Sequence, residues 1–416
     1  LEMFETQLYI AGGGAVCSAS DFWNEPEGSY REIFQNISKE ISFKKLHRYS
    51  PKQVIKLNHS GMPDGERECS ICHRHDYLKD GETECEICWT LKQMSGNILK
   101  GDFFTVTSKK EKTCLPLPGN CYLVTDTEST LRKRMKEDNY YIRSYSKNKP
   151  YSGYYVSTKL WVGDYVNGET FEELGQRATG IERIAVMRAD VDNLGQAFVR
   201  GFENEKNGSK YVTLSRTATF SRKLSMFFKY HINSLLKEGG YSILEEEAQM
   251  EKEDDRRNAL IVYSGGDDIF IVGAWDDIIG FAVDLNDNLM EYSQDTLKIS
   301  AGIGIYPSKY PISIMARETG RLEEAAKSVE GKNAVALFDE KYTFPWEEFI
   351  ENVVEEKLYF IQKYFKVVDE KGKNFLYNLL ELVRKRKEDK INIARFAYLL
   401  GRMEPKVQRG EKKEEI

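Results

Sequence analysis

Apolar runs alternate with amphipathic stretches over the middle of the chain, and this pattern predicts the elements of one domain. Short apolar runs have the length of buried strands and are found at residues 184–191, 259–264, 269–274, 297–306 and 334–338. Between them, apolar residues repeat at helical spacing over residues 215–236, 276–294 and 318–329. Helices that alternate with strands, with a hairpin between two of the strands, favour an α+β fold with a mainly antiparallel sheet.

The part of the chain before this domain shows weaker patterns. Residues 8–16 form an apolar run broken by three glycines, which predicts a strand that ends in a tight turn. Residues 32–43 predict an amphipathic helix. A shift to glycine, proline and polar residues at 58–65 indicates a boundary, and short strands with turns are expected over residues 100–155.

The remaining segments are helical or charged. Helices are predicted at residues 346–365, 373–386 and 390–403. The charged tail at 404–416 predicts disorder, and the charge-rich segment 245–257 predicts a solvated connector.

The composition limits the classes of protein to which the chain can belong. Its 416 residues suggest about three domains, and 41% hydrophobic with 30% charged residues is typical of a globular protein. No apolar run approaches the roughly 18 residues of a membrane span, and no secretory signal pattern is present. The net charge of −6 argues against a strongly basic nucleic-acid binder, although it does not exclude a local basic groove.

Four of the seven cysteines have the spacing of a metal site. Cys69 and Cys72 form one C-x-x-C pair, and Cys85 and Cys88 form a second pair after a short interval. Two such pairs suit tetrahedral zinc, which binds thiolate sulfur at about 2.3 Å. With four sulfur ligands and no open position, the site is expected to be structural. The alternative, two unrelated or redox-active pairs, is disfavoured.

Two other features near the cysteines have ordinary explanations. His75 and Asp76 form an H-D dipeptide, but an HD phosphohydrolase needs several more histidines than the five in this chain. We interpret both residues as part of a zinc-knuckle loop. Cys17, Cys114 and Cys121 lack metal-like spacing and are expected to be ordinary thiols.

Carboxylates gather at two points that the predicted sheet brings together. Asp190 follows a strand that is expected to be central, and Asp267 with Asp268 lies at the tip of the predicted hairpin. Neighbouring carboxylates repel one another unless a cation lies between them, and oxygen ligands select Mg²⁺ or Mn²⁺. Such a cluster suits two-metal phosphoryl or nucleotidyl transfer. Gly265 and Gly266 would let the backbone turn sharply and a nucleotide approach closely.

A structural explanation competes with this one, because glycine and aspartate are also the expected residues of a simple hairpin turn. Lys327 and Lys332 lie just before the last predicted strand, where they could meet triphosphate oxygens. The alternative interpretation of these two lysines is that they are solvated charges at the end of a helix.

The chain resembles a known family at these motifs. The sequences D-V-D-N-L-G at 190–195, S-G-G-D-D at 264–268, S-A-G-I-G at 300–304 and G-K-N at 331–333 occur in the order seen in palm-type nucleotide cyclases. With the four-cysteine knuckle before them and helices after them, the chain is similar to the large GGDD palm subunit of type III CRISPR–Cas effector complexes, in its Csm-type (III-A) form.

The resemblance implies a layout. It implies a ferredoxin-like palm of the nucleotide-cyclase type at residues 156–340, preceded by a zinc-binding linker domain at 61–155. A remnant of a first palm would occupy residues 1–60, and a C-terminal helical bundle with a disordered tail residues 341–416. The family's N-terminal HD nuclease domain and most of its first palm are expected to lie outside this chain, which puts deoxyribonuclease activity in doubt.

The resemblance also implies an activity, the polymerisation of ATP into cyclic oligoadenylate second messengers on target RNA binding. Asp190, Asp267 and Asp268 would be catalytic and hold Mg²⁺ or Mn²⁺, with the Val191 carbonyl as a further ligand. The ATP-binding residues it implies are Asn193, Leu194, Gly195, Ser264, Gly265, Gly266, Lys327 and Lys332. The backbone amides of 193–195 would cradle the triphosphate, and Ser264 would lie near the ribose or base.

Partners follow from the same resemblance. They would be other type III effector subunits, guide crRNA and target RNA, with single-stranded DNA as a further candidate, in a cytoplasmic complex without a membrane. Two alternatives to the ATP-cyclising enzyme stay open. One is a catalytically idle palm that serves as a scaffold for guide RNA and protein partners, and the other is a diguanylate-type cyclase.

Overall fold

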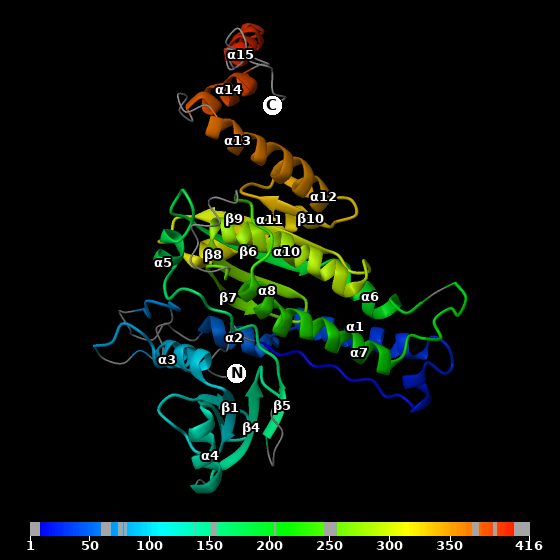
Figure 1. Ribbon diagram of the computed structural model, residues 1–416. Helices are drawn as coiled ribbons and strands as arrows, with labels where there is room; N and C mark the ends of the chain where they lie inside the picture. Colours follow the sequence, from blue (N-terminus) through cyan, green and yellow to red (C-terminus); the bar gives the residue numbers. More distant parts are fainter. Residues whose placement is uncertain are drawn as a thin grey trace. The chain divides into compact units, whose positions relative to one another are not determined.

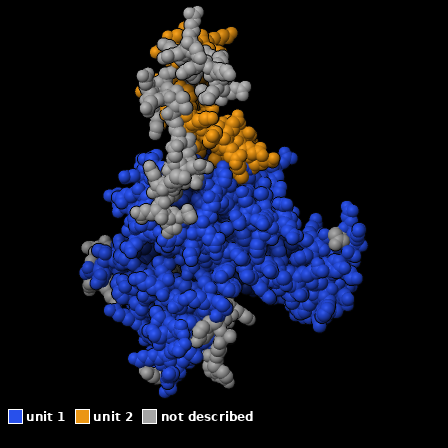
Figure 2. All heavy atoms as spheres, viewed as in Figure 1, with its two compact units in different colours: residues 1–346 blue, residues 347–416 orange. Residues whose placement is uncertain are grey.

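The computed structural model describes residues 9–59, 68–73, 78, 81–137, 139–150, 156–203, 205–244, 256–367, 374–385 and 389–402. The chain divides into two units, Leu1–Trp346 and Glu347–Ile416 (Figure 2). The first unit contains two sheets with their helices, and the second contains helices (Figure 1). Within the described residues, no helix has the length and apolar character needed to cross a membrane.

The first unit begins with helices and a five-stranded sheet. Its helices are η2 (Ser20–Trp23), α1 (Ser29–Leu46), α2 (Pro51–His59), α3 (Glu86–Lys100) and α4 (Glu128–Glu137). The strands, in the order β2-β3-β1-β4-β5, are β1 (Phe103–Thr107), β2 (Leu115–Leu117), β3 (Cys121–Asp126), β4 (Tyr141–Lys147) and β5 (Val156–Leu160). Since β5 belongs to this sheet, the sheet continues past residue 155, where we predicted the linker domain to end. The other predicted domain limits remain predictions.

A buried lysine connects this sheet to its surroundings. The ammonium of Lys147 donates to the carbonyls of Ile98 and Leu99, at the last turn of α3, at 2.8 and 3.1 Å. It also lies 3.0 Å from a carboxylate oxygen of Asp164, and Lys147 is only 7% exposed. The amide of Asp164 in turn donates to the side chain of Asn233. Lys147 thus joins α3 to the segment that leads into the second sheet.

The second sheet has six strands in the order β11-β10-β9-β6-β8-β7. They are β6 (Ile184–Val191), β7 (Ala259–Ser264), β8 (Asp268–Ala274), β9 (Ile299–Tyr306), β10 (Ala334–Leu337) and β11 (Thr343–Pro345). The helices of this region are α5 (Phe171–Gln176), α6 (Leu194–Arg200), α7 (Leu214–Met226), η3 (Phe227–His231), α8 (Ile232–Glu238), α10 (Trp275–Ser293), α11 (Ile312–Lys327) and α12 (Trp346–Glu348). All pairs but β9–β10 are antiparallel, so the predicted α+β class is confirmed.

The core of the first unit surrounds the central strands of this sheet. Consecutive residues of β6, from Ile184 to Met187, are fully buried, as is most of β9, so both faces of the sheet are covered. Helix α11 packs directly on β9, because Gly302 has no Cβ and lets the helix backbone approach. A Cβ there would lie 2.6 Å from the carbonyl oxygen of Thr319. This close packing brings the C-terminal end of α11 to the end of β6.

The described residues of the second unit are mostly helical, as predicted. It comprises η4 (Phe349–Leu358), α13 (Tyr359–Val367), α14 (Asn374–Arg384) and α15 (Ile391–Gly401). The helix predicted at 346–365 is present, with a π-helical stretch as η4. The predicted disordered tail at 404–416 lies outside the described residues.

Two predictions about local structure are wrong. Described residues 9–18 form no strand, because their backbone groups bond to side chains of α1: the Gly14 amide donates to Glu40 at 2.8 Å, and Lys44 donates to the Gly12 carbonyl at 2.6 Å. Arg257, predicted to lie in a solvated connector, is 4% exposed and pairs with Asp284. Most of that connector lies outside the described residues.

Helix α11 also begins earlier than predicted. It starts at Ile312 rather than at residue 318, directly after Pro311. Proline is common at the start of helices, since its fixed φ suits the first turn and its missing N–H is not needed there. The first turn then buries Met315 in the core.

Candidate active site

Three aspartates meet at the ends of two adjacent strands. In the antiparallel pairing of β6 with β8, Asp190 lies opposite Asp268. The amide of Val191 donates to the carbonyl of Asp267 at 3.1 Å, which holds the hairpin tip against the end of β6. The structure thus brings Asp190, Asp267 and Asp268, the predicted catalytic residues, to one edge of the sheet. Val191, the last residue of β6, is buried beside them.

The hairpin between β7 and β8 is closed at Gly265. Its amide donates to the carbonyl of Asp268 at 2.8 Å. A Cβ at this position would lie 2.1 Å from a carboxylate oxygen of Asp268 and 2.6 Å from the hydroxyl of Tyr263. Glycine is therefore required at position 265, because a larger residue would displace the Asp268 side chain. At the neighbouring Gly266, the nearest atom to such a Cβ is the hydroxyl of Ser225 on α7, at 3.6 Å.

Lys327 provides the positive charge that balances this cluster. Its ammonium, on the last turn of α11, forms an ion pair with Asp190 and lies 2.8 Å from a carboxylate oxygen of Glu323. Partial burial acts to lower the pKa of Lys327, but its bonds to Asp190 and Glu323 outweigh that effect and raise it. Glu323 also pairs with Arg188 of β6 at 3.2 Å. A chain of alternating charges therefore runs from Arg188 to Asp190.

Sequence reasoning missed Glu323 and Arg188. The four-residue spacing of Glu323 and Lys327 on one helix was the available evidence for their contact. Nothing in the sequence pairs Arg188 with Glu323, because that contact depends on how α11 packs on the sheet.

The surroundings of Asp267 at the hairpin tip disfavour the ionised form of its carboxyl. Partial burial raises the pKa of its carboxyl, the neighbouring carboxylates of Asp190 and Asp268 raise it further, and only Lys327 acts in the opposite direction. Burial and the neighbouring carboxylates of Asp268 and Asp267 raise the pKa of the nearby Tyr263. The edge of the sheet therefore holds more negative charge than its lysine neutralises.

This raised pKa predicts a pH-dependent stability. The folded state holds the Asp267 proton more tightly than the unfolded chain, so ionisation of Asp267 lowers the free energy of unfolding. This loss of stability begins as the pH rises past the unfolded pKa, about 4, and is complete above the folded pKa. We expect Asp267→Asn to raise the melting temperature at pH 7 in EDTA, with the difference shrinking toward pH 4. Thermal melts across this range test it, and a variant less stable than the parent at pH 7 would contradict it.

The donor set at this edge fits a hard divalent cation. All three aspartates offer carboxylate oxygens, the ligands that Mg²⁺ and Mn²⁺ prefer, and excess negative charge favours a cation. The Asp190 carboxylate also forms an ion pair with Lys327. Among the described residues, the three aspartates do not form a group whose ligand atoms all lie within 4.8 Å of one another, whereas the four cysteines do.

The residues predicted to bind phosphate lie beside the three aspartates. Asn193 adopts a left-handed conformation (φ 54°) and precedes α6, which begins with Leu194 and Gly195. The ammonium of Lys332 donates to the Asn193 side-chain oxygen at 2.9 Å. The structure thus places both predicted lysines near the ends of β6 and α11, one on Asp190 and one on Asn193.

Ser264 is held by a different contact. Its hydroxyl donates to the carbonyl of Phe228 in η3, which directs it toward that helix. Its predicted role near the ribose or base remains a prediction. The sequence carried no sign of this contact, because Phe228 lies 36 positions earlier in the chain.

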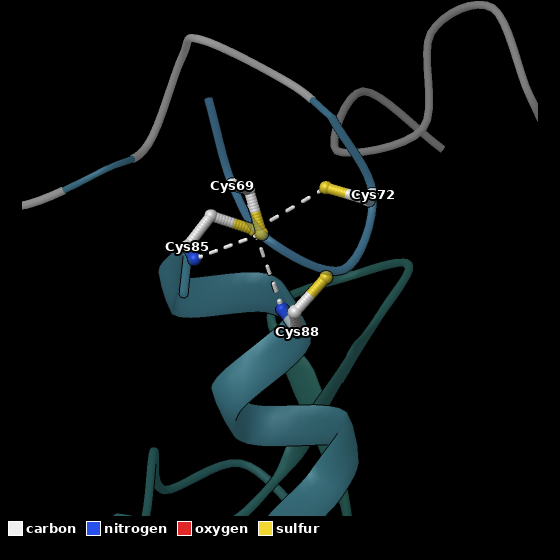
Figure 3. A group of neighbouring side chains, drawn as sticks. All are labelled: Cys69, Cys72, Cys85 and Cys88. Atoms are coloured by element: carbon white, nitrogen blue, oxygen red, sulfur yellow. Dashed lines mark hydrogen bonds between the residues drawn. The ribbon is translucent and has the colours of Figure 1, made fainter. Parts of the chain in front are cut away.

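The four cysteines form a compact cluster at the start of α3 (Figure 3). Cys85 caps this helix, and its sulfur accepts from the amide of Cys88 at 3.4 Å. The sulfurs of Cys72 and Cys85 are 3.7 Å apart, close to the roughly 3.8 Å expected between two ligands of tetrahedral zinc with 2.3 Å bonds. The sulfur of Cys69 accepts from the amide of Cys85 at 3.2 Å. Geometry and donor set therefore fit zinc.

Among the described residues, the group that could hold a metal ion here consists of the four cysteines alone. His73 is exposed, and His75 and Asp76 lie outside the described residues. Cys114 and Cys121 belong to the strand region of the first sheet, and Cys17 lies near the start of the chain.

Three family models match separate parts of the chain. The second palm domain of Cas10/Cmr2 matches residues 183–336, and Csm1 subunit domain B matches residues 1–60. The second helical domain of the Cmr2 subunit of the CRISPR RNA silencing complex matches residues 362–416.

Curated relatives are similar over nearly the whole chain. A protein from Mycobacterium tuberculosis is 43% identical over 97% of this chain and 51% of its own length. One from Streptococcus thermophilus is 40% identical over 99% of this chain and 52% of its own length. Both are named CRISPR system single-strand-specific deoxyribonuclease Cas10/Csm1 (subtype III-A). The chain spans about half the length of the curated relatives that it matches.

Solved structures share the fold. An apo Csm1–Csm4 cassette matches with a TM-score of 0.66 and 23% identity, over 94% of this chain and 51% of that chain. A Csm1–Csm4 cassette in complex with one ATP matches with a TM-score of 0.63 and 23% identity, over 96% of this chain and 52% of that chain. Together with the palm match, the cysteine cluster and the C-terminal helices, these similarities confirm the predicted fold class.

Proposed function

This chain belongs to the Cas10/Csm1 family of subtype III-A CRISPR systems, and from that premise we propose that its palm is a nucleotidyltransferase. It joins ATP molecules into cyclic oligoadenylates when the effector complex binds target RNA. The observation that carries the proposal is the meeting of Asp190, Asp267 and Asp268 beside Lys327. Solved relatives described as Csm1–Csm4 cassettes with ATP and with cA4 support the choice of nucleotide.

The reaction joins two nucleotides by a phosphodiester bond. The 3′-hydroxyl oxygen of one ATP attacks the α-phosphorus of another, the new P–O bond forms as the bond to the β-phosphate bridging oxygen breaks, and pyrophosphate leaves. The hydroxyl proton passes to solvent. Bound Mg²⁺ or Mn²⁺ would supply charge neutralisation and a lower pKa for the attacking hydroxyl. The three aspartates, with the Val191 carbonyl, would hold the ions.

The other residues of the site would position the two nucleotides. Lys327 and Lys332 would bind triphosphate oxygens, and Asn193, Leu194 and Gly195 would lie beside them. Because there is no covalent nucleophile in this scheme, the rate depends on holding the two nucleotides in line and on charge stabilisation. Gly265 and Gly266 would leave room for the nucleotide at the hairpin tip.

Partners are proposed on the same premise. We expect the native subunit to bind a Csm4-type protein, guide crRNA and target RNA, as the description of solved relatives as part of a Csm interference complex suggests. Single-stranded DNA is a further candidate partner. We assign no deoxyribonuclease role to these residues, since the resemblance ties that activity to an HD domain.

A product assay tests the proposed function. The assembled complex is incubated with ATP, Mg²⁺ or Mn²⁺ and cognate target RNA, and the products are separated by mass. Cyclic oligoadenylates that depend on target RNA support the proposal. Products made from GTP in preference to ATP would identify a diguanylate-type cyclase, and no product from the intact complex would contradict catalysis.

One observation favours an idle scaffold as the second candidate. The ion pair of Lys327 with Asp190 places a positive charge of the protein itself on a proposed metal ligand. A palm that served only to hold partners could keep this pair permanently. An active palm must exchange it for a metal ion and a triphosphate.

Replacing Lys327 tests whether this ion pair competes with a metal ion for Asp190. Lys327→Met removes a tethered cation that competes for Asp190, so Mn²⁺ should bind about fivefold more tightly without nucleotide, since a partly exposed ion pair contributes up to about 1 kcal/mol. Electron paramagnetic resonance of free Mn²⁺ measures this directly. Lys341→Met is the matched control, because Lys341 pairs with Asp339 on an exposed turn. Unchanged or weaker Mn²⁺ binding in Lys327→Met would count against competition.

A further inference from the structure

A fourth aspartate of the motif is placed unlike the other three. Asp192 is 6% exposed, whereas the Asp190 side chain is 28% exposed. Its Oδ2 accepts from the hydroxyl of Ser300 and from the amide of Asn333, each at 2.9 Å. Two donors aimed at one oxygen leave no room there for a cation. Through this oxygen, Asp192 bonds to protein groups rather than to the proposed metal ions.

The loop that Asp192 holds has an unusual backbone. Gly331, Lys332 and Asn333 have φ values of 81°, 54° and 53°, so three successive residues are left-handed. Glycine adopts this region freely and asparagine tolerates it, but lysine rarely does, so the strain is at Lys332. The partly buried bond from the Asn333 amide to Asp192 is a contact that selects this conformation. The carbonyl of Asn333 accepts from the amide of Trp346, which holds the loop from its other side.

The loop conformation decides where Lys332 points. With Asn333 fixed to Asp192, the Lys332 ammonium reaches the side chain of Asn193, the residue that follows Asp192. The two turns, 192–193 and 331–333, are thus joined by one partly buried bond and one exposed bond. If the partly buried bond is lost, Lys332 and Asn333 can relax to negative φ, and the lysine leaves the edge of the sheet.

We propose that Asp192 is a positioning residue that holds Lys332 in place for the triphosphate of ATP. This inference rests on the proposed function, because it takes Lys332 as a phosphate ligand. Asp192 acts through its hydrogen-bond acceptor and not through its charge. It therefore differs in role from Asp190, although both belong to the same D-x-D motif.

The conservative substitution Asp192→Asn tests whether Asp192 acts as a hydrogen-bond acceptor or through its negative charge. Asp192→Asn keeps one acceptor oxygen for Ser300 and Asn333. It replaces Oδ1, which is buried without a hydrogen-bond partner among the described residues, by an N–H donor. The Asn333 side-chain oxygen is likewise buried and unpartnered in that part of the chain. Asp192→Asn should therefore bind ATP within about twofold of the parent.

The test measures ATP binding in Mg²⁺ by calorimetry, so it does not depend on product formation. Asp192→Ala should weaken ATP binding about tenfold, as should Lys332→Ala. The double variant should bind no more weakly than either single variant, because both remove the same lysine contact. In the active complex, Asp192→Ala should raise KM for ATP with kcat nearly unchanged. Lys341→Ala, on an exposed turn, is the control for loss of a lysine.

Two results would overturn the proposal: additive losses in the double variant, or ATP binding by Asp192→Asn as weak as by Asp192→Ala. If Asp192→Ala does not fold, Asp192→Asn still decides, because retained binding supports an acceptor role and lost binding refutes it. A third result is possible: the parent binds ATP, the Asp192 and Lys332 variants show non-additive losses of ATP binding, and yet no oligoadenylate forms. That result would remove the proposed function and leave the role of Asp192 intact.

Discussion

Asp267→Asn and Asp268→Asn are each expected to lower oligoadenylate formation about a thousandfold or more. Each variant removes one carboxylate from a cluster that must hold divalent cations against the triphosphate. Loss of such a ligand costs several kcal/mol of transition-state stabilisation, and about 4 kcal/mol corresponds to a thousandfold change in rate. The backbone bonds of the hairpin tip use main-chain groups, so they survive both substitutions.

Product formation in the assembled complex measures this effect, with target RNA binding as the second readout. RNA binding and assembly should be unchanged in both variants, because the substitutions are nearly isosteric. Asp339→Asn is a suitable control, since Asp339 follows β10 and so lies at the opposite end of the sheet. Loss of RNA binding with the activity would mean that the GGDD turn is a structural element and not a site.

Loss of the cysteine cluster is expected to have the largest effect on stability. Zinc binding contributes roughly 10–16 kcal/mol of folding free energy in small zinc modules. Cys85→Ser removes a proposed zinc ligand, while the serine hydroxyl can still cap α3, so the variant should abolish zinc binding and lower the melting temperature by roughly 10 °C or more. Chelation of the parent protein should have the same effect.

Metal analysis by mass spectrometry and thermal melts check this prediction. The parent should contain about one zinc per chain. Cys121→Ser is the matched control, because this partly buried thiol lies in β3 and should keep both the zinc and the melting temperature. Purified parent protein without zinc, or a Cys85→Ser variant as stable as the control, would refute a structural zinc site.

The sequence predicted much of the second sheet because its strands are buried on both faces. Continuous apolar runs such as 184–191 and 269–274 correspond closely to β6 and β8. The turn chemistry of the GGDD segment then indicated the hairpin, and the hairpin indicated which aspartates would meet. Residues 9–18 were predicted wrongly for the converse reason, since their backbone bonds to α1 side chains that no local pattern reveals.

The finer arrangement of the site depends on contacts between distant segments. Lys327 was predicted to face phosphate, but its bond to Asp190 depends on the packing of α11 on Gly302. The loop before β10 is left-handed at Asn333, which tolerates this conformation, and also at Lys332, which has no preference for it. Its conformation follows from Asp192, far away in the sequence, and could be seen only in the folded chain.

The buried ammonium of Lys147 has a consequence for the cooperativity of unfolding. It bonds to the carbonyl end of α3, whose other end carries two of the clustered cysteines, and to Asp164 on the path to the second sheet. If either module separated from the other, a buried charge would lose partners at a cost of several kcal/mol. The cysteine module and the catalytic sheet are thereby coupled into one unfolding transition, although their chemistry is unrelated.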